Sequence, residues 1–129
     1  MNTENSIKYL DFCHQLANAA DKISMPSFVE QKNLTIEKKT DGSFVTQADK
    51  QIEEHLSAMI NSKFPSHGFF GEETAHKNAE SDFKWIIDPI DGTHGFMRGM
   101  PIWATLIALE YNQQIITSMI SAPALGSRW

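Results

Sequence analysis

The stretch Trp85–Phe96 constrains the fold of this chain more than any other segment. An apolar run, Trp85–Ile87, is followed by Asp88, and a second carboxylate, Asp91, comes three positions later. Pro89 fixes its own φ and favours an extended conformation for Asp88. An acidic residue at the C-terminal end of a strand faces the crevice in which open α/β sheets bind ligands. The pattern therefore predicts a strand that ends at Asp88 in a rigid turn, beside a ligand site.

Gly92 and Thr93 complete this motif. They provide a tight turn whose backbone N–H groups would suit a phosphate if a helix begins there. Two carboxylates beside such an anion site imply divalent cations that neutralise the combined charge. The alternative is a turn without chemistry, because Asp-Pro and Asp-Gly are both common turn dipeptides. A turn alone does not require acidic partners elsewhere in the chain, and this chain has them.

Two adjacent carboxylates, Glu72 and Glu73, follow a short apolar strand expected over residues 68–71. The end of this strand would again present acid to the crevice. Successive side chains of an extended chain point to opposite sides, so we expect only one of the two to be a metal ligand. A solvated loop is the alternative, since residues 76–82 are polar.

Asp49 is a further acidic position, at the start of a helix expected over Gln47–Phe64. Thr46 suits the N-cap, and Asp49 three residues later matches a shortened capping box. In this interpretation Asp49 complements the positive end of the helix dipole. In the other interpretation it acts as a base close to the metals. The local pattern supports both.

Another amphipathic helix is expected over residues 4–24. It should end at Met25-Pro26, because the residue before a proline avoids the α region. The predicted buried stripe consists of Ile7, Leu10, Cys13, Ala17 and Ala20.

The other apolar segments have β-strand character. Alternation of apolar and polar residues predicts a strand over Leu34–Lys39, followed by a turn at Thr40–Ser43. Two apolar runs, Trp103–Tyr111 and Ile115–Ala122, predict a hairpin. These segments and the two helices predict a mixed α/β (α+β) fold.

Composition excludes several classes of function. The net charge of −5 argues against general nucleic-acid binding. Cys13 is the only cysteine, so no intramolecular disulfide can form and a reducing cytoplasm fits. No apolar run approaches the length of a membrane span. The five histidines include no pair at metal-ligand spacing, which leaves oxygen ligands and hence magnesium or manganese.

These residue types suit metal-assisted hydrolysis of a phosphate monoester. One magnesium ion would lower the pKa of a bound water, and a second would stabilise the leaving alkoxide. Thr93 and Glu72 could orient the attacking water, while the amides of Gly92 and Thr93 hold the phosphate.

Three motifs resemble the inositol monophosphatase-like family of magnesium-dependent phosphatases: Asp49 after Val45-Thr46, Gly71-Glu72-Glu73, and Asp88–Thr93. The resemblance extends from about residue 7 to the end of the chain. It implies the N-terminal half of a layered αβαβα sugar-phosphatase fold, with two long helices packed on a mainly antiparallel sheet. The whole chain would then be the N-terminal part of a single domain that is incomplete at its C-terminus.

The resemblance also implies metal ligands. Glu72, Asp88 and the carbonyl of Ile90 would hold one metal, and Asp88 with Asp91 a second. A complete site of this family would hold two or three Mg²⁺ ions, with Mn²⁺ as an alternative.

Catalytic and substrate-binding roles follow from the same resemblance. Asp49, Glu72 and Thr93 would surround and orient the nucleophilic water. The phosphate would lie against Asp91, Gly92, Thr93 and Glu72.

Loop and core segments narrow the resemblance to the histidinol-phosphatase branch: Phe96–Pro101, Trp103–Leu109 and Ser121–Leu125. The expected reaction converts histidinol phosphate and water to histidinol and phosphate, a step of histidine biosynthesis. Inositol monophosphate and a nucleotide bisphosphate are alternative substrates within the family.

An alternative of another class is an inactive fragment that only binds metal or forms dimers. Its apolar strands would then need a partner. The expected partners are a small phosphorylated metabolite and a second copy of the chain in a homodimer, without nucleic acid or membrane.

Overall fold

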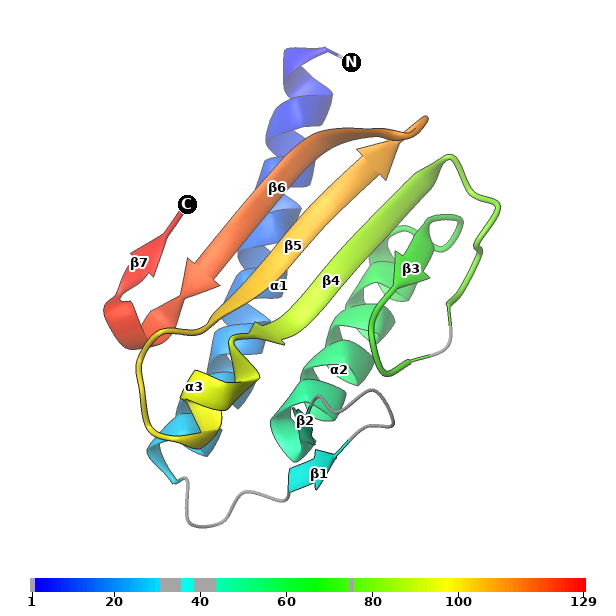
Figure 1. The fold of residues 1–129 in the computed structure, drawn as a ribbon. Coiled ribbons are helices and arrows are strands. Elements are labelled where there is room, and N and C mark those ends of the chain that lie inside the picture. Colours follow the sequence, from blue (N-terminus) through cyan, green and yellow to red (C-terminus); the bar gives the residue numbers. More distant parts are fainter. Residues whose placement is uncertain (1, 31–35, 39–43, 75) are drawn as a thin grey trace.

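The computed structural model describes residues 2–30, 36–38, 44–74 and 76–129. Two long helices, α1 and α2, lie on one face of a five-stranded sheet (Figure 1). None of the helices within these residues is both long and apolar enough to cross a membrane. In chain order the elements are α1 (Thr3–Val29), β1 (Ile36–Lys38), β2 (Phe44–Thr46), α2 (Gln47–Lys63), β3 (Gly68–Phe70), β4 (Phe83–Asp91), α3 (Thr93–Met97), β5 (Ala104–Tyr111), β6 (Gln114–Ala122), a 3₁₀ turn (Pro123–Leu125) and β7 (Ser127–Arg128).

The large sheet has the strand order β3-β4-β5-β6-β7, in which only the β3–β4 pair is parallel. This confirms the mixed α+β fold with a mainly antiparallel sheet. The β5–β6 hairpin turns at Asn112 and Gln113, with φ of 48° and 68°. Positive φ at both central residues matches the twist of the flanking strands, so the predicted hairpin is confirmed.

A separate antiparallel pair, β1 with β2, precedes α2. It confirms part of the strand expected over Leu34–Lys39. The rest of that segment, and the turn expected at Thr40–Ser43, lie outside the described residues.

The buried face of α1 differs from the predicted stripe. Cys13, Ala17 and Ala20 are buried as expected, but Ile7 is 55% exposed and Leu10 is 42% exposed. Tyr9, Phe12 and Leu16 are buried in their place. Aromatic side chains bury more apolar area than aliphatic ones, so the helix rotates to place Tyr9 and Phe12 in the core.

The expected end of this helix at Met25-Pro26 is wrong, because α1 continues through Pro26 to Val29. A proline this close to the C-terminus removes one backbone hydrogen bond but leaves its own carbonyl free to accept the Glu30 N–H at 3.0 Å. The Phe28 ring in the last turn lies 5.3 Å from the Trp103 ring, between centroids. This packing stabilises the turn against the cost of the proline.

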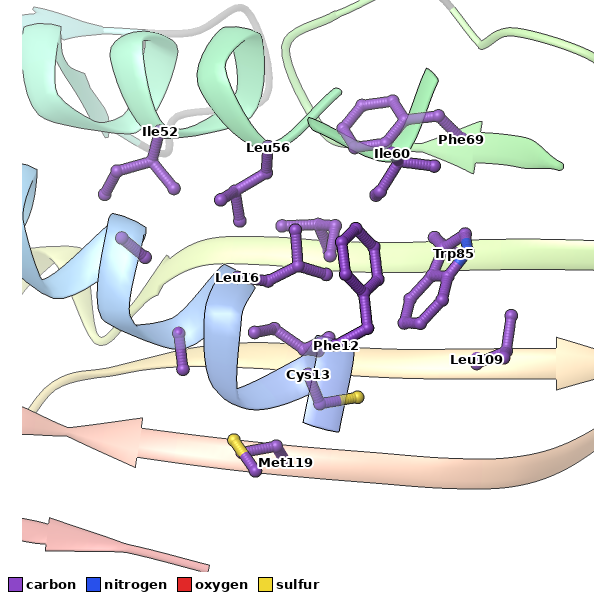
Figure 2. Packing of buried hydrophobic residues seen from close by; sticks show 14 of the residues in the cluster. Phe12, Cys13, Leu16, Ile52, Leu56, Ile60, Phe69, Trp85, Leu109 and Met119 are labelled. Atoms are coloured by element: carbon purple, nitrogen blue, oxygen red, sulfur yellow. The ribbon is translucent and has the colours of Figure 1, made fainter. Parts of the chain in front are cut away.

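The core lies between the helices and the sheet (Figure 2). Phe12 and Leu16 of α1 point into the space between α2 and β4. The Phe12 ring meets the Trp85 ring edge-on, with the centroids 5.4 Å apart. Burying each such side chain contributes roughly 1.5–3 kcal/mol. The core therefore fixes α2 relative to β4, the two elements that carry Asp49 and Asp88.

Candidate active site

The parallel pairing of β3 and β4 brings two predicted site residues together. Phe70 of β3 is in register with Ile86 of β4. Glu72 lies two residues after Phe70, and Asp88 lies two residues after Ile86, so both come at the same edge of the sheet. The carboxyl ends of parallel strands are the usual position of ligand sites in such sheets.

Electrostatics shows how closely the acidic residues gather. Burial, and then the charges of Glu72, Asp91 and Asp49, together raise the pKa of Asp88 to about 7. Four predicted site residues from α2, the β3–β4 loop and β4 therefore form one cluster, which we call the acidic cluster. Such mutual repulsion is typical of a site that binds a positive group.

The strand that carries this cluster is longer than predicted. β4 does not end at Asp88 but continues to Asp91, with an irregularity between these two residues where Pro89 interrupts the ladder. The Thr105 hydroxyl of β5 donates to the Pro89 carbonyl at 2.8 Å. A bulge of this kind re-aims side chains while the strand stays paired. It leaves Asp88 half-buried and Asp91 exposed.

Asp88 has one carboxylate oxygen, Oδ1, that is buried and finds no hydrogen-bond partner among the described residues. A buried oxygen without a partner is costly, and such atoms commonly mark an ion or a functional site. Carboxylates and a backbone carbonyl are the oxygen donors that Mg²⁺ prefers. The donor set therefore fits a divalent cation in its chemistry. In geometry, no three His, Cys, Asp or Glu side chains of the described ranges converge to hold a metal ion.

Asp49 satisfies both sequence interpretations in part. Its Oδ2 accepts the Thr46 N–H at 2.8 Å and the Thr46 hydroxyl at 2.7 Å, so the predicted capping box is confirmed. The side chain is nevertheless only 2% exposed. Burial raises its pKa most, against the lowering effect of the Thr46 hydrogen bonds, and the charges of Glu73 and Glu72 add to the rise. Asp49 thus caps α2 and also borders the acidic cluster.

Thr93 and Ile90 are joined by a hydrogen bond from the Thr93 hydroxyl to the Ile90 carbonyl, at 3.0 Å. A carbonyl oxygen has two lone pairs, so this bond leaves one for a metal. Gly92 is the N-cap of α3 with φ of 87°, so a helix does begin where the anion site was expected. A Cβ at Gly92 would lie 2.8 Å from the Ile102 carbonyl oxygen, and only glycine fits there.

The sequence interpretation missed Glu53. This residue of α2 is fully buried, and its carboxylate accepts hydrogen bonds from the backbone N–H groups of Glu72, Glu73 and Thr74. A signal was present in the sequence. Glu53 is charged although it follows Ile52 on the buried stripe, and it lies one helical turn after Asp49 on the same face.

The fold and the acidic cluster together define a class of protein, an α+β domain with carboxylates gathered where two parallel strands end. The chain belongs to the inositol monophosphatase family, because the model of that family matches residues 7–129. The predicted family is therefore confirmed.

Curated relatives agree with this assignment. The chain is 41% identical over 128 residues to a histidinol-phosphatase of Streptomyces coelicolor, covering 94% of this chain and 47% of the relative. It is 38% identical over 112 residues to an inositol-1-monophosphatase of Mesorhizobium japonicum, covering 86% of this chain and 42% of the relative. The chain thus spans a little under half the length of the curated relatives it matches.

Solved structures have the same fold. The extragenic suppressor protein suhB from Bartonella henselae superposes with a TM-score of 0.88 at 30% identity, covering 94% of this chain and 47% of that one. A structure of IMPase/NADP phosphatase complexed with Mg²⁺ and phosphate superposes with a TM-score of 0.78 at 27% identity. That match covers 98% of this chain and 48% of the solved one.

Proposed function

We propose that this chain carries the metal-binding half of a magnesium-dependent phosphatase that hydrolyses histidinol phosphate to histidinol and phosphate. The observation that carries the proposal is the buried Oδ1 of Asp88, which has no partner within the described residues and lies among the carboxylates of the acidic cluster. The identity to the Streptomyces histidinol-phosphatase supports the substrate.

In this proposal Glu72, Asp88, Asp91 and the Ile90 carbonyl would hold the cation, whose charge would draw together carboxylates that repel one another without it. Magnesium, when bound, supplies positive charge at the phosphate and favours the ionisation of water. The match to a structure complexed with Mg²⁺ and phosphate supports this choice of ion. The proposal extends to two or three ions in a complete site, with Mn²⁺ as a substitute.

The chain's own groups would position the reactants. The Thr93 hydroxyl and the Glu72 carboxylate orient the attacking water, and Asp49 borders that water from the start of α2. The backbone N–H groups of Gly92 and Thr93 bind the phosphate at the N-terminus of α3, beside Asp91.

Inositol 1-phosphate is the second candidate substrate, because the relative from Mesorhizobium japonicum carries that activity in its name. We also propose a cytoplasmic homodimer. Light scattering on the purified chain tests the dimer, and a monomeric mass would overturn it.

Phosphate release tests the function. Wild-type chain is mixed with histidinol phosphate or inositol 1-phosphate, with and without magnesium, beside the variants Asp88→Asn and Asp11→Asn. Asp11 is exposed on α1 and is not among the charges that shift the pKa of Asp88, so it serves as the matched control. Magnesium-dependent release that Asp88→Asn abolishes and Asp11→Asn retains would support the proposal. No release from folded wild-type chain would overturn activity at this length and favour the inactive fragment.

A further inference from the structure

Glu53 is a fully buried carboxylate to which the proposed reaction gives no role. Its Oε2 accepts the backbone N–H of Glu72 at 3.0 Å and that of Glu73 at 2.7 Å. Its Oε1 accepts the N–H of Thr74 at 3.0 Å. One carboxylate of α2 therefore binds three successive peptide groups of the loop that follows β3.

The loop is shaped to receive this carboxylate. A Cβ at Gly71 would overlap the Glu53 oxygen and would lie 2.7 Å from its Cδ. Glycine at this position therefore allows the carboxylate to reach the backbone.

Packing alone does not account for a charge at this position. A buried carboxylate is costly unless it is hydrogen-bonded, and charge-assisted bonds to N–H groups are the strong ones that offset such a cost. An apolar side chain on this face of α2 would be buried without that cost. The three bonds therefore point to a role in holding the loop.

We propose that Glu53 is a positioning residue for the acidic cluster. By holding the backbone of Glu72–Thr74 against α2, it sets where the Glu72 carboxylate lies relative to Asp88. The core fixes α2 relative to β4. The hydrogen bonds of Glu53 therefore also fix the position of Glu72 relative to Asp88 on β4. Because both oxygens of Glu53 accept hydrogen bonds from peptide N–H groups, it acts on a bound cation through the loop and not as a ligand. The cation itself rests on the proposed function.

The test uses the variant Glu53→Gln, which puts an NH₂ group where a backbone N–H donor needs an acceptor. Glu54→Gln is the matched control, since Glu54 is the next residue of α2 and is exposed. Two quantities are measured on folded protein: amide hydrogen exchange at residues 72–74 by NMR, and Mn²⁺ affinity by electron paramagnetic resonance. We expect exchange to rise at least about tenfold in Glu53→Gln and Mn²⁺ affinity to fall about tenfold or more. Glu54→Gln should match wild type in both.

Unchanged exchange at residues 72–74 or unchanged Mn²⁺ affinity in Glu53→Gln would overturn the positioning role. If wild-type chain binds no Mn²⁺, the proposed function fails, and the exchange data alone support or overturn the hold of Glu53 on the loop. Should Glu53→Gln not fold, Gly71→Ala serves instead. Its added Cβ would overlap the Glu53 carboxylate and push it away from the backbone of the loop. Wild-type exchange and affinity in folded Gly71→Ala would equally overturn the proposal.

Discussion

The two ends of β4 bury polar groups in opposite ways. Near its start, the Trp85 indole N–H donates to His67 Nδ1 at 3.0 Å, and the His67 ring is stacked between Phe64 and Phe83 with centroids 4.5 Å away on each side. Near its end, Asp88 buries an oxygen that meets no donor in the part of the chain that the structure describes. A matched polar group contributes to stability, whereas an unmatched one is typical of a site. One end holds the fold together, and the other leaves a buried oxygen without a donor, as the proposed cation site requires.

Burial favours the neutral form at both ends but shifts the two pKa values in opposite directions. Burial, and then the charge of Lys8, lowers the pKa of His67 to about 4. Burial, and then the neighbouring carboxylates, raises the pKa of Asp88 to about 7. The difference follows because histidine is charged when protonated and aspartate when deprotonated. Mutation and pH can therefore separate the two ends.

The largest expected effect is at the aromatic end. Trp85→Ala should lower the free energy of unfolding by about 3–5 kcal/mol, because it removes a fully buried ring and leaves a cavity. It also leaves His67 Nδ1 without its donor. Urea denaturation measures the change, and Trp129→Ala is the control because Trp129 is 67% exposed. A loss below about 1 kcal/mol for Trp85→Ala would contradict the assignment of this end to stability.

The second largest effect is expected from pH, which should change the stability contributions of His67 and Asp88 in opposite directions. Between pH 6.5, the ordinary pKa of histidine, and about pH 4, the unfolded chain protonates His67 before the folded chain does. Stability therefore falls with falling pH through His67, by up to about 1.4 kcal/mol per pH unit. The contribution of Asp88 to stability has the opposite sign between about pH 7 and 3.8, the ordinary pKa of aspartate. In this range the folded chain holds a proton on Asp88 that the unfolded chain has lost, so stability rises as the pH falls.

The two contributions oppose each other in wild type over this window, so removing one reveals the other. Without divalent cations, Asp88→Asn should lose stability more steeply than wild type as pH falls from 6.5 to 4.5. His67→Gln should lose it less steeply. Urea denaturation at several pH values gives the slopes, and equal slopes in all three proteins would contradict the opposing signs.

A smaller effect is expected from the acidic end at fixed pH. At pH 8 without divalent cations, Asp88→Asn should raise the free energy of unfolding by about 1–2 kcal/mol, because it removes a charge that burial and the neighbouring carboxylates both disfavour. The figure allows for solvent screening of the half-buried Asp88. It should also remove any rise in melting temperature that magnesium produces in wild type. Thermal denaturation with and without magnesium measures both. A destabilised Asp88→Asn would show that the Asp88 charge supports the fold and would remove the contrast with His67.

Local patterns predicted those parts of the molecule that local forces decide. The capping box at Thr46 and Asp49 and the β5–β6 hairpin each depend on a few neighbouring residues, and both are present. The predicted end of α1 was wrong because Phe28, which follows Pro26, packs on residues far away in the sequence. Such packing leaves no signature in a short window.

The same limit applies to the site. The motifs at Glu72 and Asp88 could be noticed because each places carboxylates directly after an apolar strand, a pattern visible within a few residues. Glu53 was missed because its partners are backbone N–H groups 19 to 21 residues away, which any amino acid except proline could supply. The length of β4 was missed because its pairing beyond Asp88 is set by β5.

The smallest expected effect comes from the bulge of β4. Thr105→Val keeps the side-chain shape but removes the donor to the Pro89 carbonyl, and the expected loss is about 1 kcal/mol of stability. Because the bulge sets the spacing between Asp88 and Asp91, the variant should also weaken Mn²⁺ binding, by less than Asp88→Asn does. Urea denaturation and a Mn²⁺ titration on the same samples measure both quantities. If stability falls while Mn²⁺ affinity stays at the wild-type value, the bulge supports only the fold. In that case the part of β4 that serves stability extends beyond Pro89, and the bulge does not belong to the proposed cation site.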